Sequence, residues 1–219
     1  WRVQVSDGSI LVENSTNYGT FPELKTAKTY VTLPSISYGV ARTILSFNLS
    51  GLGSNIQIQN ANASMFCWRT PVLASSQQID VYYINMTGNW TETGVTWDNQ
   101  PTFYDLDLID SQTFGVSTDC DGDWRTWNVT DVATGWVNGS LANDGIIFKR
   151  NSEAQAVGAN DNKTYSSNDN GTNRPLLEIQ FTVIPYNTTN WIATLTIPNT
   201  NSIFTAKQTW RDYEGLQSW

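Results

Sequence analysis

Alternating carboxylates around Cys120 have the spacing best suited to metal chemistry in this sequence. Asp119, Asp121 and Asp123 can turn their oxygens toward one Ca²⁺, which prefers such ligands. Three further carboxylates that could contribute lie upstream, namely Asp105, Asp107 and Asp110. The loop is not an EF-hand, because its glycine is misplaced and no glutamate closes it. A calcium site is one interpretation and a solvated turn is the other, and the polar stretch 160–170 has the same ambiguity.

Paired carboxylates can also support catalysis, as they do in glycosidases. Glu92 and Asp98 are close in sequence, but nothing in the sequence marks either of them as removed from water. The chain has no histidine, which excludes Ser-His-Asp triads, Cys-His pairs and His-ligated metals. Its two cysteines are too few for a Cys₄ zinc site or an iron–sulfur cluster. We therefore predict no catalytic residues, no enzyme activity and no cofactor other than the calcium ion considered above.

The two cysteines, Cys67 and Cys120, are candidates for a disulfide. An oxidising compartment would allow the bridge to form and persist. A bridge closing a loop of about 50 residues would stabilise the fold by roughly 3–4 kcal/mol in the loop-entropy model. Two buried free thiols are the alternative, since a sequence does not show the separation that a bridge requires.

Ten N-x-S/T sequons point to an extracellular, glycan-coated protein. They begin at Asn14, Asn48, Asn62, Asn85, Asn89, Asn128, Asn138, Asn162, Asn170 and Asn187. Only 15% of the residues are charged, so glycans would supply the solubility that charge does not. An Asn- and Thr-rich β-protein also collects sequons by chance, which is the alternative explanation. We predict a secreted or cell-surface protein whose signal peptide was removed before Trp1.

Tryptophan can stack against the CH groups of a pyranose, and the chain has ten tryptophans. Trp68 and Trp124 lie close in sequence to the two cysteines, so a disulfide would bring their rings together. These two residues are the candidate carbohydrate-binding pair. A packed cluster without a ligand is the alternative.

The charge balance argues against several classes of partner. Twelve Lys and Arg against twenty Asp and Glu give a net charge of −8, with no basic run. Nucleic-acid binding needs a positive surface, so we predict no nucleic-acid partner. Acidic polysaccharides and anionic lipids are disfavoured for the same reason. No apolar stretch reaches the ~18 residues of a membrane span, so we predict no membrane insertion.

Apolar and polar residues alternate along most of the chain, and Gly, Asn, Asp and Pro interrupt the pattern. The expected strands are Arg2–Val5, Ile10–Glu13, Lys25–Thr32, Arg42–Leu49, Ala63–Arg69, Ile79–Ile84, Thr126–Val129, Gly145–Arg150 and Leu176–Ile184. One short helix is expected over Asp131–Val137, with Thr130 or Asp131 as its cap and Trp136 facing inward. Strands at this spacing predict an all-β, antiparallel, jelly-roll-like β-sandwich.

A second region follows the sandwich, so we divide the chain into a domain at 1–184 and an extension at 185–219. In the extension, Trp191–Ile197 alternates cleanly and Ser202–Trp210 offers another strand. The extension is too short to fold alone. It must pack on the main body, pair with another chain or open a further domain.

Four segments carry a family pattern in order: ENSTNYGTFPELKT (Glu13–Thr26), RTILSFNLSGL (Arg42–Leu52), WTETGVTWDNQP (Trp90–Pro101), and WNVTDVATGWVNGSLANDGIIF (Trp127–Phe148) with NRPLLEIQF (Asn173–Phe181). Together they resemble the DNRLRE family of secreted domains, which includes carbohydrate-binding modules and repeats of archaeal disaggregatase-related surface proteins. The third segment, similar to the pattern W-x-E-x-x-V-T-W-x-x-x-P, is the most specific. The resemblance covers roughly residues 6–184, and it departs from the family where Asn48 replaces an acidic residue.

The resemblance implies a jelly-roll-like sandwich, an extracellular setting and a structural role for Glu92. It also implies that four tryptophans belong to the core, namely Trp90, Trp97, Trp127 and Trp136. These expectations leave two functional hypotheses.

The preferred hypothesis is a non-enzymatic, N-glycosylated structural subunit of a cell-surface filament or layer. Copies of the chain would pair through Trp191–Trp210 by strand exchange, as in donor-strand complementation. The alternative is a carbohydrate-binding or adhesion module of a larger secreted protein, with surface polysaccharide as its partner. The extension would then be an ordinary additional strand or a linker.

Overall fold

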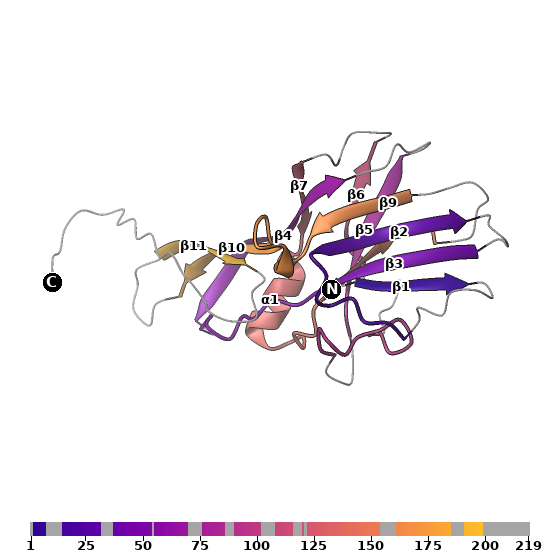
Figure 1. Ribbon diagram of the computed structural model, residues 1–219. Coiled ribbons are helices and arrows are strands. Elements are labelled where there is room, and N and C mark those ends of the chain that lie inside the picture. Colours follow the sequence, from indigo (N-terminus) through magenta and orange to yellow (C-terminus); the bar gives the residue numbers. More distant parts are fainter. Residues whose placement is uncertain are drawn as a thin grey trace.

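The computed structural model of the chain describes residues 2–7, 15–31, 37–53, 55–69, 76–85, 90–101, 108–115, 120, 122–153, 161–184 and 191–198. Figure 1 shows its strands, which are β1 (Arg2–Asp7), β2 (Glu23–Val31), β3 (Ser37–Leu45), β4 (Ile56–Arg69), β5 (Gln77–Tyr83), β6 (Leu108–Phe114), β7 (Asp123–Asn128), β8 (Ile146–Arg150), β9 (Asp161–Ser166), β10 (Leu176–Val183) and β11 (Trp191–Pro198). Within these ranges the helical elements are α1 (Thr130–Asn138) and a 3₁₀ turn, η2 (Asn168–Asn170).

The strands form one curled antiparallel sheet in the order β11-β10-β4-β9-β2-β3-β8-β5-β6, with β1 added to β3 and β7 to β4. The long β4 joins two parts of the sheet, because its first half pairs with β10 and its second half with β7 and β9. Figure 1 shows β1, β3, β2 and β9 side by side, with β10 and β11 at the far end of β4. The all-β, sandwich-like fold predicted from the sequence is confirmed.

The core lies on the inner face of this sheet and is centred on Trp127 of β7, which is fully buried. The Trp127 ring lies 4.9 Å from Phe148, 6.3 Å from Phe114 and 6.4 Å from Tyr165, measured between centroids. Its Nε1 donates a hydrogen bond to the carbonyl oxygen of Ile79 at 3.2 Å. Trp127 is therefore a core residue, as the resemblance implied.

Two strands, β6 and β9, lie outside the strands predicted from the sequence. The stretch 160–170 read as a polar loop, yet Asp161–Ser166 is β9 and Asn168–Asn170 is η2. Strand β9 pairs with both β2 and β4, so ladder hydrogen bonds on two sides support a sequence of low strand propensity. The predicted strands Ile10–Glu13 and Ser202–Trp210 lie outside the described residues.

The helix α1 extends the predicted range by one residue at each end, and Trp136 is buried as predicted. The predicted cap is wrong, because the N-cap is Val129 and no side chain caps it. Thr130 is already helical, and its hydroxyl accepts the backbone N–H of Ala61 on β4 at 2.9 Å. That bond ties the helix to the sheet instead of closing the first turn. No helix among the described residues is long and apolar enough to span a membrane.

The first strand of the C-terminal extension pairs with its own chain. Strand β11 runs antiparallel to β10, with Leu177 opposite Ile197 and Phe181 opposite Ala193. This arrangement matches the alternative in which the extension is an additional strand of the sheet. Self-association through Trp191–Trp210 stays a prediction, since 199–219 lie outside the described residues.

Burial of Tyr165 predicts a loss of stability at high pH. Burial raises the pKa of Tyr165 far above its ordinary value, and the Thr26 hydroxyl and the Arg125 guanidinium lower it by less. The unfolded chain therefore releases this proton above about pH 10 while the folded chain keeps it, so the free energy of unfolding falls by about 1.4 kcal/mol per pH unit. Urea denaturation across this range should show a slope that is steeper by about this amount in the wild type than in Tyr165→Phe. Equal slopes in the two proteins would contradict the prediction.

Candidate functional site

The segment Trp90–Pro101 is anchored by Asn17, which lies two residues before Gly19 in the first family segment, Glu13–Thr26. The Asn17 side-chain amide donates to the backbone oxygens of Glu92 at 2.7 Å and Val95 at 2.6 Å. Gly19 lies against the same Glu92 carbonyl, and a Cβ at this position would overlap that oxygen. The first and third family segments therefore pack on each other, so these segments have a structural role.

The same segment covers part of the outer face of the sheet. Five buried residues form a second apolar cluster there, namely Ile44, Tyr82, Ile84, Val95 and Ile147, with Trp90 and Trp97 half-buried against it. The Trp90 Nε1 donates to the backbone oxygen of Asp144 at 2.6 Å, which fixes the start of the segment. Trp90 and Trp97 are thus half-buried on the outer face, whereas the other two tryptophans implied to be core residues, Trp127 and Trp136, lie in the main core.

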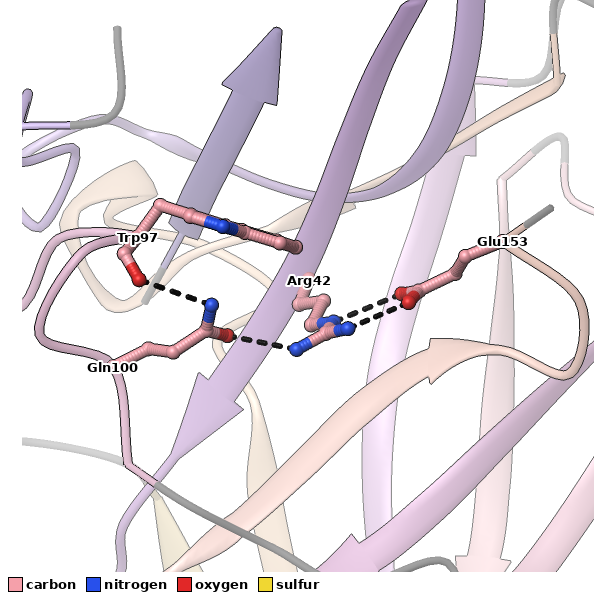
Figure 2. A network of polar contacts seen from close by, with 4 residues as sticks. All are labelled: Arg42, Trp97, Gln100 and Glu153. Carbon is pink, nitrogen blue, oxygen red and sulfur yellow. Dashed lines mark hydrogen bonds and ion pairs between the residues drawn. The ribbon is translucent and has the colours of Figure 1, made fainter. Parts of the chain in front are cut away.

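Arg42 of β3 joins this segment to a neighbouring loop through a network shown in Figure 2. Its guanidinium makes two hydrogen bonds to the carboxylate of Glu153, at 2.9 and 2.6 Å. A third bond reaches the side-chain oxygen of Gln100 at 3.0 Å, and Gln100 donates to the backbone oxygen of Trp97. The guanidinium carbon lies 4.5 Å from the centre of the Trp97 ring, so the charge also faces an aromatic surface.

A second polar group surrounds Asp80 of β5, on the same outer face as Tyr82. Asp80 is 4% exposed as a residue, and its carboxylate accepts hydrogen bonds from Gln78 and Ser111 at 2.7 Å each, and from Tyr82 at 3.1 Å. Asp80 is opposite Lys149 of β8 and Ser111 of β6 in the sheet register. The Lys149 ammonium lies 5.0 Å above the Tyr82 ring.

We call these groups the polar face, formed by Arg42, Gln78, Asp80, Ser111, Lys149 and Glu153. Its two cations and two carboxylates balance each other, so its local charge is near zero, unlike that of the whole chain. Hydrogen bonds hold Arg42 to Glu153, and hold Gln78 and Ser111 to Asp80. All six residues except Asp80 remain partly exposed to water. Pre-ordered donors and acceptors of this kind lose little entropy when they bind a polar ligand. One sequence signal pointed to this face: alternation along the strand puts Asp80 and Tyr82 on one face, and Ile79 and Val81 on the other.

The predicted calcium residues have other contacts where the structure describes them. Asp123 accepts the N–H of Trp124 at 2.8 Å and lies 3.8 Å from the Arg125 guanidinium. Asp110 accepts the backbone N–H groups of Ser111 and Asn128, and so links β6 to β7. In the described part of the chain, no three His, Cys, Asp or Glu side chains gather as a metal site. The other four carboxylates, Asp105, Asp107, Asp119 and Asp121, lie outside the described residues.

The predicted disulfide is present between Cys67 and Cys120, whose Cα atoms are 5.0 Å apart. Both residues are fully buried in the main core. The backbone N–H of Gly122 donates to the carbonyl oxygen of Cys67, which holds the start of β7 against β4. The bridge therefore secures the ladder on which Trp124 lies.

Of the predicted carbohydrate-binding pair, Trp124 is exposed and Trp68 is half-buried. The aromatic partner of Trp124 is Phe66, whose ring centroid lies 5.6 Å away in an edge-on arrangement. Phe66 is directly opposite Trp124 in the β4–β7 register, whereas Trp68 is two residues further along β4. The sequence reasoning did not identify Phe66, because its pairing depends on a register between distant segments.

The predicted glycosylation residues are spread over several elements. Asn48, Asn85, Asn128 and Asn138 are exposed, whereas Asn62 and Asn170 are half-buried. The side-chain nitrogen of Asn170 donates to the backbone oxygen of Pro22 at 3.2 Å, so a glycan there would break that bond. Asn162 lies on β9, and Asn14, Asn89 and Asn187 lie outside the described residues. Occupancy of every sequon stays a prediction.

Comparison with protein-family models gives a match that covers most of the chain. Residues 4–181 match the carbohydrate-binding module family 96, a span that includes nearly the whole curled sheet without β11. The comparison with curated proteins gave no match. The family match agrees with the carbohydrate-binding side of the resemblance described above and favours a non-catalytic domain, while the DNRLRE family itself stays a prediction. Because the match covers well over half of its length, the chain belongs to carbohydrate-binding module family 96.

Proposed function

We propose that the chain is a non-catalytic carbohydrate-binding module of an extracellular protein, and that it binds a neutral polysaccharide at the polar face. Family membership is the observation that carries the binding function. The polar face supports the proposed location, because its ordered and partly exposed side chains can both donate and accept hydrogen bonds.

The chemistry of the polar face favours hydroxyl groups as its ligands. Gln78 and Lys149 can donate hydrogen bonds to a ligand, and Gln78 and Ser111 can accept them, because the one hydroxyl hydrogen of Ser111 is already donated to Asp80. Arg42 and Lys149 are balanced by Asp80 and Glu153, so the face has no net charge with which to attract an anionic polymer. The Trp97 indole lies at the margin of the face and offers an apolar surface beside the polar groups.

The hypothesis of a filament or layer subunit has less support. It required a free strand in the extension, and Trp191–Pro198 already pairs with β10 of the same chain. The carbohydrate-binding alternative needs no such exchange. An extra strand at the edge of the sheet is compatible with a module inside a larger secreted protein.

Removing donors from the polar face should weaken polysaccharide binding. We expect the double variant Gln78→Ala/Lys149→Ala to bind a neutral polysaccharide about tenfold more weakly or worse, since each lost hydrogen bond costs about 0.5–1.5 kcal/mol. Isothermal titration calorimetry against a panel of soluble neutral and acidic polysaccharides would measure the affinities.

The matched control is Thr126→Ala, an exposed residue on β7 outside the polar face. It should bind like the wild type. Unchanged affinity in the double variant would place the site elsewhere, and binding of acidic polymers alone would overturn the proposed ligand class. A wild-type protein that binds nothing in the panel would contradict the proposed function.

A further inference from the structure

The outer side of the β4–β7 ladder carries a strip of side chains that changes from polar at one end to aromatic at the other. We call it the outer strip, and its three cross-strand pairs are Asn62 with Asn128, Ser64 with Thr126, and Phe66 with Trp124. The Ser64 and Thr126 hydroxyls are 2.8 Å apart and share a hydrogen bond. The strip therefore runs from two sequon asparagines, across two hydroxyls, to an aromatic pair.

The aromatic end of the strip leaves apolar surface in contact with water. Trp124 is 37% exposed, and its ring touches Phe66 at an edge. A group that stacked on this indole would bury its flat apolar face, provided that it also tolerated the neighbouring hydroxyls. The apolar face of a pyranose ring has both properties.

The two asparagines at the other end are not equivalent. Asn62 lies on the central strand between Asn128 of β7 and Glu178 of β10, and it is half-buried. Asn128 lies on β7, which pairs only with β4 in the described sheet, and it is exposed. The side-chain oxygen of Asn128 accepts the N–H of Thr130 at 3.0 Å, so the amide turns its oxygen toward α1. Asn128 thus has more room for a bulky substituent on Nδ2.

We propose that Asn128 is the N-glycosylated residue of the pair and that its glycan lies along the outer strip, with a pyranose stacked on Trp124. Asn128, Thr126 and Trp124 are alternate residues of one strand, so their side chains share a face. Asn128 and Trp124 are four positions apart on the strand, which corresponds to ~13 Å. A short oligosaccharide spans this distance. Occupancy of directly opposed Asn62 is disfavoured, because opposed residues of a ladder are only ~5 Å apart.

The modification is a group transfer that needs one co-reactant, a lipid-pyrophosphate-linked oligosaccharide of the secretory pathway. The Asn128 Nδ2 forms a bond to C1 of the first sugar, and the bond from C1 to the lipid pyrophosphate breaks. The pyrophosphate leaves with the electron pair, and the amide proton passes to a base of the transferase. No atom is oxidised or reduced.

The test uses the full chain, secreted from a glycosylating host, as wild type, Asn128→Gln and Asn62→Gln. Glycopeptide mass spectrometry locates the glycan, and hydroxyl-radical footprinting measures oxidation of Trp124. Proteolytic cleavage after Arg125 separates Trp124 from Asn128, so the two readouts come from different peptides. Wild type made in a host without glycosylation supplies an unmodified reference that needs no substitution.

We expect a glycan on Asn128, and Trp124 oxidation that is severalfold lower in the glycosylated wild type than in Asn128→Gln or the unmodified reference. Asn62→Gln should keep the low oxidation of the glycosylated wild type. An unmodified Asn128, or a glycan on Asn62 in its place, would overturn the site assignment. Equal oxidation of Trp124 with and without the Asn128 glycan would overturn the stacking contact. Because the outer strip excludes the polar face residues, failure of this proposal leaves the proposed polysaccharide site untouched.

Discussion

Replacing Trp127 with alanine is expected to lower the free energy of unfolding by about 3–5 kcal/mol, the usual cost of truncating a large buried aromatic side chain. Trp127 is fully buried, and three aromatic rings from β6, β8 and β9 surround it. Truncation would open a cavity where these strands meet and would remove the hydrogen bond to Ile79. Chemical denaturation followed by circular dichroism would measure the change.

Trp124→Ala is the matched control, because Trp124 lies on the same strand and has its ring on the outer side. It should cost about 1 kcal/mol or less, the usual worth of an edge-on aromatic contact at a surface. Trp127→Phe should fall between the two variants, since it keeps most of the ring volume. Similar losses for Trp124→Ala and Trp127→Ala would contradict the assignment of Trp127 as the centre of the core.

Reducing the Cys67–Cys120 disulfide is expected to lower the free energy of unfolding by about 4 kcal/mol. The cross-link restricts the unfolded chain, so reduction raises the conformational entropy of the unfolded state. The bridge spans 53 positions of sequence, which include β5 and β6. It also fixes Cys67, near the end of β4, to Cys120, three positions before β7 begins. Urea denaturation of the oxidised and reduced wild type would measure the effect without any substitution.

The double variant Cys67→Ala/Cys120→Ala separates the cross-link from the packing of the two sulfur atoms. Both cysteines are fully buried, so this variant should lose more stability than reduction alone. Addition of reductant to the variant should have no effect. An unchanged denaturation midpoint in the reduced wild type would show that the cross-link contributes nothing to stability.

Local patterns in the sequence predicted most of the sheet. Alternation along Ile79–Ile84 predicted that Ile79 and Val81 share one face of a strand, because a period of two is a property of the strand itself. The structure buries that face in the core. Strands β6 and β9 lacked that signal. Lys163 of β9 is fully buried, with its ammonium 5.2 Å above the Phe114 ring. The polar sequence around Lys163 does not predict this buried environment. Pairing with β2 and β4 gives this segment its conformation.

The two proposed sugar-contacting surfaces, the polar face and the outer strip, depend on contacts between distant residues. Arg42 and Glu153 are 111 positions apart, and Asp80 and Ser111 are 31 apart. The Phe66–Trp124 contact likewise follows from one register between β4 and β7, and a shift by one residue would turn Trp124 toward the core. Local sequence patterns predict the strands and the side chains on each face, but they do not predict which strands become neighbours.

The sequence by itself determined the class of protein: an antiparallel β-fold without histidine chemistry, with one bridgeable cysteine pair and a family pattern that includes sugar-binding modules. These properties reside in composition, in the spacing of residues along one strand and in short motifs. Only the tertiary structure decided that the family motif closes over Ile44 and Tyr82, and that the polar face lies beside it. The physical reason is that sheet order and register are set by burial and hydrogen bonding summed over the whole chain, which no local segment contains.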